Sequence, residues 1–124
     1  MKKTNTGQLR IVAGKWRSRL LQVANVPGLK PTSIRIRETL FNWLSPRIEG
    51  ARCLDLCAGT GALGLEALSR GASRVVFVEC SEIAFQNLKL NINSLKASGA
   101  EIKKTDAISF LNNSKKEKFD IIFI

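Results

Sequence analysis

The sequence predicts an α/β protein built on a doubly wound parallel sheet. After residue 50, short apolar runs that are typical of strands alternate with segments of helical periodicity. Their order is strand, helix, strand, helix, strand, helix, strand, which is typical of parallel sheets connected by crossover helices. The chain has 124 residues, 44% of them hydrophobic, which is enough for one domain with a core of its own.

Residues 1–48 precede this alternation and predict a basic extension. Segments 8–14 and 19–23 have the pattern of two short strands joined by a turn, so we expect a β-hairpin. Two prolines and a glycine mark residues 25–32 as a loop. A helix is expected to follow this loop.

That helix begins where Thr32 or Ser33 can act as the N-cap, and it is expected to run to about Leu44. Pro46 is expected to end or limit it, because proline removes a backbone donor and clashes with the preceding turn. Its apolar face is expected to comprise Ile36, Leu40, Trp43 and Leu44.

Residues 49–124 form the first part of the predicted sheet domain. The expected strands are 52–57, 74–79, 100–105 and 119–124. The expected helices are 61–71, 81–95 and 107–112. Gly71 is expected to close the first helix and Ser81 to cap the second. The strand at 100–105 is the most polar, so we place it near an edge of the sheet.

The charge of +10 is concentrated near the N-terminus. Residues 1–50 carry ten Lys and Arg against two Glu, whereas the rest of the chain is close to neutral. A basic region on a near-neutral body favours a polyanionic partner, most simply a nucleic acid, although surplus lysine also keeps proteins soluble.

The cysteines, together with the lack of histidine, limit the disulfide and metal chemistry that the chain can support. Cys53, Cys57 and Cys80 do not form a disulfide framework, and there is no histidine to complete a zinc site, so no metal is expected. We expect Cys53 and Cys57 to be small buried hydrophobes. The basic N-terminus lacks the apolar run of a secretory signal, and no apolar run is long enough for a membrane span. The expected location is the cytoplasm.

A glycine-rich loop joins the first predicted strand of the sheet to its helix. Gly59, Gly61 and Gly64 match G-x-G-x-x-G in the strand-to-helix context of Rossmann-like folds. Such a loop can hold a dinucleotide, a nucleotide phosphate or S-adenosylmethionine, or it can be a tight turn that binds nothing. The Gly-Lys-Ser/Thr of a P-loop is absent. Asp55 favours S-adenosylmethionine over NAD, because a carboxylate is unfavourable beside a pyrophosphate but favourable beside an ammonium and a sulfonium.

Two further carboxylates follow the next two strands. Glu79 ends the second strand, 18 residues after Gly61, where an acidic residue can accept hydrogen bonds from ribose hydroxyls. Asp106 follows the third strand and could accept from an adenine amine. Each also has a simpler interpretation: a solvated strand end for Glu79, and the N-cap of the short helix for Asp106.

Three stretches together resemble one known family. They are RIVAGKWRSRLL (10–21), GLKPTSIRIRETLFNWL (28–44) and LDLCAGTGALGLEALSRGA (54–72). In these segments the chain resembles the RsmD family of bacterial methyltransferases, which methylate the exocyclic amine (N2) of a guanine in 16S rRNA. The resemblance implies a Rossmann-like S-adenosylmethionine-dependent methyltransferase fold, preceded by the hairpin and helix and represented by its first four strands.

The resemblance also implies site residues. The cofactor would be bound by Asp55, Cys57, Ala58, Gly59, Gly61, Glu79, Cys80, Asp106 and Ala107. Residues 1–48 would face the RNA, with phosphate contacts from Arg10, Lys15, Arg17, Arg19, Arg35 and Arg37. Arg35 and Arg37 could equally bind the carboxylate of the cofactor. The implied partner is rRNA, in an assembling small ribosomal subunit.

The chain departs from the family pattern at two places. Ile34 stands where the family usually has an aspartate. The family continues its fourth strand into Asp-Pro-Pro-Phe/Tyr, a loop that positions the target amine, whereas this sequence ends at Ile124. We therefore expect a truncated form that does not transfer methyl groups alone and tends to associate, where the complete protein would be a monomer. The alternatives are a non-catalytic cofactor- and RNA-binding remnant and, less favoured, part of an NAD-binding oxidoreductase.

Overall fold

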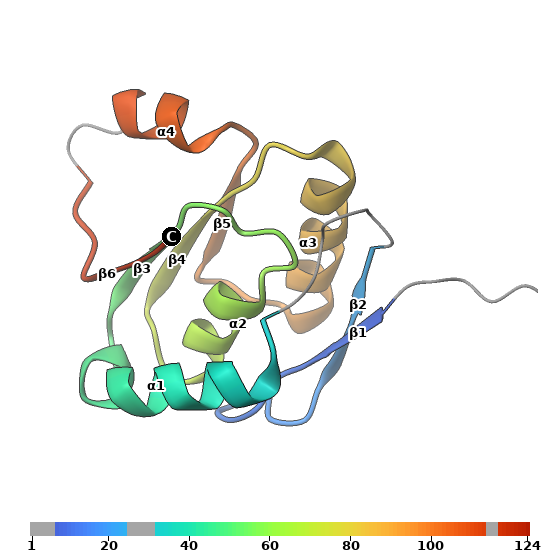
Figure 1. Ribbon diagram of the computed structural model, residues 1–124, viewed down its shortest axis with the longest axis vertical. Helices are drawn as coiled ribbons and strands as arrows, with labels where there is room; N and C mark the ends of the chain where they lie inside the picture. The colour runs from blue at the N-terminus through green and yellow to red at the C-terminus, as the bar shows by residue number, and fades with distance from the viewer. Residues whose placement is uncertain (1–6, 25–31, 114–116) are drawn as a thin grey trace, which may run out of the picture.

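The computed structural model describes residues 7–24, 32–113 and 117–124 (Figure 1). Its strands form two sheets, one of two strands and one of four. The smaller sheet is an antiparallel hairpin of β1 (Gly7–Arg10) and β2 (Leu20–Val23). The larger sheet is parallel, in the order β5-β4-β3-β6, and comprises β3 (Arg52–Asp55), β4 (Arg74–Val78), β5 (Ala100–Lys103) and β6 (Ile121–Phe123).

Within the described ranges, four helices connect and cover these strands. They are α1 (Ile34–Ile48), α2 (Ala62–Ser69), α3 (Glu82–Leu95) and α4 (Ala107–Asn113). The predicted hairpin and the alternation after residue 50 are confirmed, and β5 and β6 lie at the two edges of the sheet among the described strands. Ser33 and Ser81 are the N-caps of α1 and α3, as expected. The predicted loop at 25–31 lies outside the described residues.

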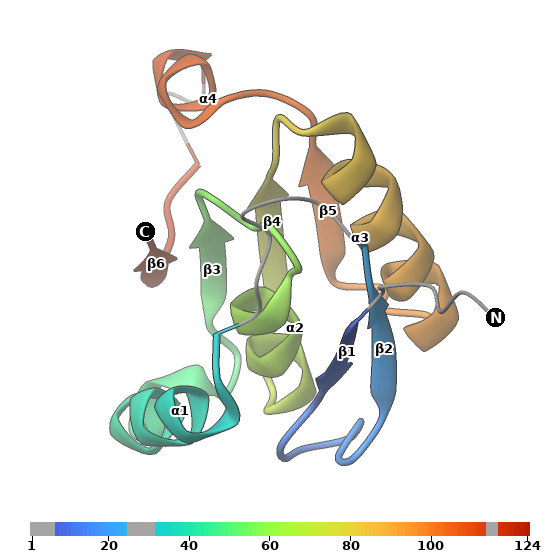
Figure 2. The same ribbon diagram turned by 45° about the vertical axis from the view of Figure 1, so that its right-hand side comes forward.

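The two faces of the parallel sheet are covered unequally (Figure 2). Helices α1, α2 and α3 and the hairpin lie on one face, and they enclose the main core with Cys53, Val75 and Phe77. The opposite face has a smaller cluster, in which Phe110 of α4 packs with Leu54, Leu56, Val76 and Val78. Because successive residues of a strand point to opposite faces, each central strand contributes to both clusters.

The orientation of α1 agrees with the expected one only in part, because Leu40 and Leu44 pack against the main core as expected but Ile36 and Trp43 do not. Its buried residues are Arg37, Phe41 and Ile48, whereas Ile36 is 58% and Trp43 76% exposed. The helix is rotated because Phe41 packs against Phe123 of β6, with ring centroids 5.8 Å apart, and because Arg37 has a buried partner described below.

Pro46 lies inside α1 and does not end it. The helix continues only two residues past the proline, so Pro46 limits α1 without ending it at once, and it is tolerated because it lies in the exposed last turn. There the Asn42 carbonyl that loses its donor can be solvated, so the helix continues to Ile48.

The hairpin and the parallel sheet share one apolar core. Leu9, Ile11, Trp16 and Leu21 of the N-terminal region are buried in the same cluster as Leu65 of α2. A boundary between residues 48 and 49 stays a prediction, and the hairpin is packed directly on α2. No helix of the described residues is long and apolar enough to cross a membrane.

Candidate functional site

The C-terminal edge of the parallel sheet brings the three predicted carboxylates to one side of the molecule. Asp55 is the last residue of β3, Glu79 follows β4, and Asp106 lies three residues after β5. These strands are parallel neighbours, so their C-terminal ends lie at a common edge (Figure 2). This is the edge where doubly wound sheets bind ligands.

The glycine loop leaves this edge and leads into α2. Gly59 and Gly61 have φ values of 54° and 83°, in the left-handed region that favours glycine. A Cβ atom on Gly61 would lie 2.4 Å from Leu88 Cδ1, so this glycine also permits the approach of α3. Gly64 meets the same kind of constraint, because its Cβ would lie 2.2 Å from the Phe77 ring. The loop is therefore fixed by packing on both sides.

Asp55 is a buried carboxylate, and the residue is only 3% exposed. Burial raises its pKa to about 6, and the nearby charge of Glu79 acts in the same direction. Hydrogen bonds from the backbone of Gly64 and Cys57 lower the pKa but do not offset the burial. A cation placed at this edge would therefore stabilise the ionised form of Asp55.

Glu79 connects the two loops at the ends of β3 and β4. Its Oε1 accepts a hydrogen bond from the Gly59 N–H at 2.7 Å, and its Oε2 accepts one from the Ser81 N–H at 2.8 Å. Each carboxylate oxygen has two acceptor positions, so both oxygens keep capacity for a ligand hydroxyl. Glu79 is therefore more than a solvated strand end.

Asp106 is exposed and caps the first turn of α4. It accepts hydrogen bonds from the Ser109 N–H at 2.8 Å and the Ser109 hydroxyl at 2.9 Å, and these bonds lower its pKa. This is the simpler of the two roles considered for it. Ala107 beside it is half-buried.

The remaining predicted cofactor residues lie in the same two loops. Ala58 is buried, and its N–H donates to the Val78 carbonyl, which ties the β3 loop to β4. Cys57 and Cys80 are exposed at the ends of adjacent strands, whereas Cys53 is buried. The expectation that Cys57 is a buried hydrophobe was wrong, because β3 ends at Asp55 and Cys57 already belongs to the loop.

The predicted phosphate-binding residues divide into two groups. Arg10, Lys15, Arg17, Arg19 and Arg35 are exposed. Arg37 is only 2% exposed, and its guanidinium donates to the Glu66 carboxylate at 3.0 Å, to the Arg10 carbonyl and to the Thr32 carbonyl. This placement corrects the expectation for Arg37, because a guanidinium enclosed by these acceptors does not reach a surface phosphate.

Glu66 is the partner that sequence reasoning missed. It lies in α2, is fully buried, and accepts hydrogen bonds from Arg37, from Arg70 at 2.8 Å, and from the N–H groups of Val12 and Ala13. A lone charge in the apolar stretch 61–69 was the available signal, because buried carboxylates are paired. The carboxylate joins the hairpin, α1 and α2.

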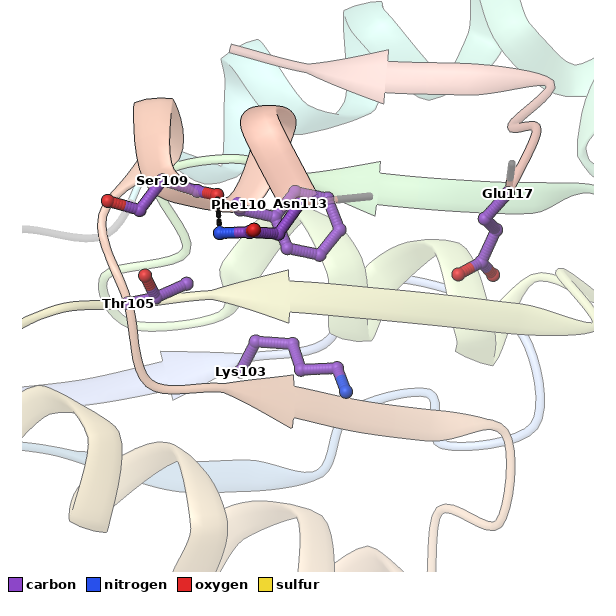
Figure 3. A pocket seen from close by; sticks show the side chains of 6 residues that line it. All are labelled: Lys103, Thr105, Ser109, Phe110, Asn113 and Glu117. Carbon is purple, nitrogen blue, oxygen red and sulfur yellow. Dashed lines mark hydrogen bonds between the residues drawn. The ribbon is translucent and has the colours of Figure 1, made fainter. Parts of the chain in front are cut away.

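A pocket of about 350 Å³ lies away from the glycine loop, between β5 and α4 (Figure 3). It is lined by Lys103, Thr105, Ser109, Phe110, Asn113 and Glu117. Its one carboxylate, Glu117, is paired with Arg74 at 2.8 Å, and the Asn113 amide donates to the Ser109 carbonyl. These lining groups are engaged with neighbours and do not form a catalytic set.

The fold and the carboxylate-lined edge define a Rossmann-like α/β protein of the methyltransferase class. A solved structure from Escherichia coli, yhhF, described as a candidate methyltransferase, is 45% identical with a TM-score of 0.84, over 95% of this chain and 63% of that one. The hypothetical protein TTHA0928 of Thermus thermophilus is 32% identical with a TM-score of 0.79, over 92% of this chain and 66% of that one.

The family model described as "Conserved hypothetical protein 95" matches residues 9–124. The chain belongs to this family, which is the RsmD family that its motifs resemble. It is 49% identical to "Ribosomal RNA small subunit methyltransferase D" of Escherichia coli K12, over all of this chain and 64% of that protein. The protein of the same name from Haemophilus influenzae is 45% identical, over all of this chain and 68% of its own length. The chain thus spans about two thirds of these relatives.

Proposed function

We propose that this chain binds S-adenosylmethionine at the C-terminal edge of the parallel sheet and serves the methylation of a guanine amine, at N2, in small-subunit rRNA. The main observation behind this proposal is the pair of carboxylates, Asp55 and Glu79, on either side of a glycine loop. Curated relatives named rRNA small subunit methyltransferases, at up to 49% identity, support the reaction and the RNA. They favour this function over NAD-dependent oxidation.

Asp55 supports a cationic ligand. Its burial makes the ionised carboxylate unfavourable, and an ammonium or sulfonium nearby would compensate that charge. A pyrophosphate would instead add negative charge beside a buried carboxylate. When bound, S-adenosylmethionine supplies an electrophilic methyl group on its sulfonium sulfur.

The glycine loop and Glu79 fit the nucleoside part of the same ligand. Glu79 is held across the loop by Gly59 and Ser81, so its carboxylate is oriented before any ligand arrives. We place the ribose hydroxyls on this carboxylate. The remaining proposed contacts, from the loops that follow β3, β4 and β5, are Cys57, Ala58, Gly61, Cys80, Asp106 and Ala107. An adenine amine would share Asp106 with Ser109.

The proposed RNA-facing residues are Arg10, Lys15, Arg17, Arg19 and Arg35, within a basic N-terminal region at 1–48. Exposed guanidinium and ammonium groups bind phosphates without reading sequence, which positions the RNA. An assembling small subunit in the cytoplasm is the proposed setting. The basic charge of the N-terminal half supports a polyanionic partner.

Calorimetric titration with S-adenosylmethionine tests the cofactor site. Asp55→Ala and Glu79→Gln are each expected to weaken binding at least 10-fold, while Glu49→Gln, an exposed carboxylate after α1, is expected to leave it unchanged. Unchanged affinity in both site variants, or tighter binding of NAD than of S-adenosylmethionine, would contradict the proposal.

Methyl transfer is tested separately with radiolabelled cofactor and small-subunit rRNA that lacks the modification. Nuclease digestion and mass spectrometry would identify N2-methylguanine and thereby establish the reaction. Cofactor and RNA binding without transfer would show that these residues hold both ligands but do not catalyse the transfer alone.

A further inference from the structure

We propose that a pocket between α1, the C-terminal end of α2 and the turn that joins β1 to β2 is a binding site for a phosphate group. The pocket and the glycine loop lie at opposite ends of α2, so it is separate from the proposed cofactor site. The inference does not rest on the proposed function, because it depends only on the charge and the hydrogen-bond donors of this pocket.

The pocket is formed by three parts of the chain that pack on the same face of the parallel sheet (Figure 2). Its volume is about 250 Å³, which is large enough for a phosphate ion. The described residues that line it are Gly14, Phe41, Ser45, Ile48 and Arg70. Two of these are buried apolar side chains, the other three each carry a polar hydrogen, and none is a carboxylate.

The charge of the pocket comes from Arg70, whose side chain is 16% exposed. Its Nε donates to the Glu66 carboxylate at 2.8 Å, and its guanidinium lies over the Phe41 ring, 5.1 Å from the ring centroid. These two contacts fix the plane of the guanidinium. A guanidinium has five N–H donors, and those on the Nη atoms have no acceptor among the described residues. The Nη edge is therefore available to a ligand.

The ion cluster behind this pocket has a surplus of positive charge. The single carboxylate of Glu66 is shared by two guanidinium groups, those of Arg37 and Arg70. Arg37 and Glu66 are 2% and 0% exposed, and the Arg37 guanidinium is enclosed by Glu66 and two backbone carbonyls. The surplus charge therefore lies at Arg70. A poorly solvated charge without a partner is unfavourable, so an anion in the pocket would stabilise this cluster.

Two neutral donors complete the lining. The N–H groups of Ala13 and Lys15 are both bonded to α2, whereas the Gly14 N–H between them has no acceptor among the described residues. A Cβ atom on Gly14 would lie 2.0 Å from the Ser69 carbonyl oxygen, so this backbone is held close to α2. The Ser45 hydroxyl, on the exposed side of α1, also has no described partner. Such donors must be satisfied by solvent or by a ligand.

The negative groups near the pocket do not compete for its donors. The C-terminal end of a helix disfavours an anion, but the last carbonyls of α2 already accept hydrogen bonds from the N–H groups of the turn and of residues 70–72. The Glu49 carboxylate follows the lining residue Ile48 but lies beside Gly71, where an added Cβ atom would be 2.6 Å from its Oε1. It is not part of the lining.

The number and placement of the donors favour a phosphate over a carboxylate. The Nη edge of a guanidinium binds two oxygens of either group. The Gly14 N–H and the Ser45 hydroxyl come from two other elements, and only a phosphate has further oxygens for them. The phosphate can be a free ion or a phosphodiester of RNA, since both present the same oxygens.

An NMR titration of the amide resonances, at constant ionic strength, tests the pocket. The probes are inorganic phosphate, acetate as a carboxylate, and a short single-stranded RNA without a terminal phosphate. The variants are Ser45→Ala, which removes one donor, and Arg70→Lys, which keeps the charge but removes the planar guanidinium. The control is Asn42→Ala, an exposed polar residue of α1 that does not line the pocket.

We expect phosphate to shift the Gly14 resonance to saturation and acetate to bind about 10-fold more weakly, because it leaves donors unpaired. Ser45→Ala should weaken phosphate binding about 5-fold through the loss of one hydrogen bond, and Arg70→Lys about 10-fold through the loss of bidentate binding. Asn42→Ala should bind as the wild type does. Ser45 and Arg70 lie outside the turn, so their variants separate this pocket from the exposed cations of the turn.

Three results would overturn the inference: no saturating shift of Gly14, equal affinity for acetate and phosphate, or equal losses in Ser45→Ala and Asn42→Ala. None of them would affect the titration with S-adenosylmethionine, so the proposed function is judged separately. If the RNA shifts the Gly14 resonance and free phosphate competes with it, the pocket takes a phosphodiester of RNA. If only inorganic phosphate shifts it, the pocket takes a free phosphate.

Discussion

Asp55, at the end of β3, and Glu66, in α2, are two buried carboxylates whose surroundings differ. Glu66 is surrounded by two guanidinium groups and two backbone N–H groups. Asp55 has backbone hydrogen bonds but no cation among its described neighbours, and its pKa rises to about 6. The negative charge of Glu66 is therefore compensated within the fold, whereas that of Asp55 is not.

The difference separates a structural carboxylate from a proposed binding one. Folding provides every partner that Glu66 needs, so its charge is used to hold the hairpin and α1 on α2. The partner that Asp55 lacks has to come from outside the chain. Strongly perturbed carboxylates in such positions are candidates for ligand binding.

The largest expected effect comes from removing the compensated charge. Glu66→Leu leaves Arg37 buried without its partner, so the free energy of unfolding should fall by about 3–5 kcal/mol. Urea unfolding followed by the fluorescence of buried Trp16 measures this. The double variant Arg37→Met/Glu66→Leu should recover part of the loss, because it removes the orphaned charge. A single-variant loss below about 1 kcal/mol would contradict the comparison.

Replacing the uncompensated charge of Asp55 should change the free energy of unfolding in the opposite direction. A shift of about two pKa units corresponds to about 3 kcal/mol of destabilisation when Asp55 is ionised. Asp55→Asn should therefore raise the free energy of unfolding at pH 7.5 by about 1–2 kcal/mol, less than the full amount because an amide accepts fewer hydrogen bonds. Thermal melts measure the change.

The size of this stability difference between Asp55→Asn and the wild type should depend on pH. The folded-state pKa of Asp55 is raised, so its ionisation cost is absent below about pH 4 and complete above about pH 6. The stability of Asp55→Asn relative to the wild type should therefore grow between these values. A constant difference across this window would show that Asp55 is not the titrating group.

The affinity for S-adenosylmethionine should follow the same ionisation. A cationic ligand needs ionised Asp55. At pH 5, one unit below the pKa of Asp55 in the free protein, most of this carboxyl group is protonated. Lowering the pH from 7 to 5 should therefore weaken binding about 10-fold. Calorimetry at the two pH values measures this. In Asp55→Asn, whose residual binding is weaker, the pH dependence should disappear.

The smallest expected effect concerns charges that solvent already screens. Arg74 pairs with Glu101 and Glu117 across β4, β5 and the segment before β6, and all three side chains are about a third exposed. Arg74→Gln should lower the free energy of unfolding by less than about 1 kcal/mol. Chemical denaturation in low and high salt measures the difference, which should shrink as salt rises. A loss as large as that of Glu66→Leu would remove the distinction between buried and exposed pairs.

Local signals in the sequence predicted much of the fold. The caps were expected at Ser81 and at either Thr32 or Ser33, because a hydroxyl before a helical pattern satisfies its free N–H groups, and Ser33 and Ser81 are the caps. The glycine loop and the strand-end carboxylates were placed at one edge, because parallel strands end together. These features depend on neighbours in sequence or on the direction of strands.

The buried ion pair could not be predicted in the same way. Arg37 and Glu66 are 29 residues apart, and no local pattern joins them. The apolar residues of α1 suggested a face with Ile36 and Trp43, whereas the helix buries Phe41 and Arg37. Which face of an ambiguous helix is buried depends on partners that arrive from distant parts of the chain.

Helix α2 has one further consequence, which concerns insertions and deletions. Its first turn follows the glycine loop, and its last residue, Ser69, accepts a hydrogen bond from the Trp16 N–H in the turn between β1 and β2. One added residue would rotate one end against the other by about 100° and separate them by about 1.5 Å. Glu66 and Ser69 would then face away from the groups they bind. The length of this helix should therefore tolerate little change.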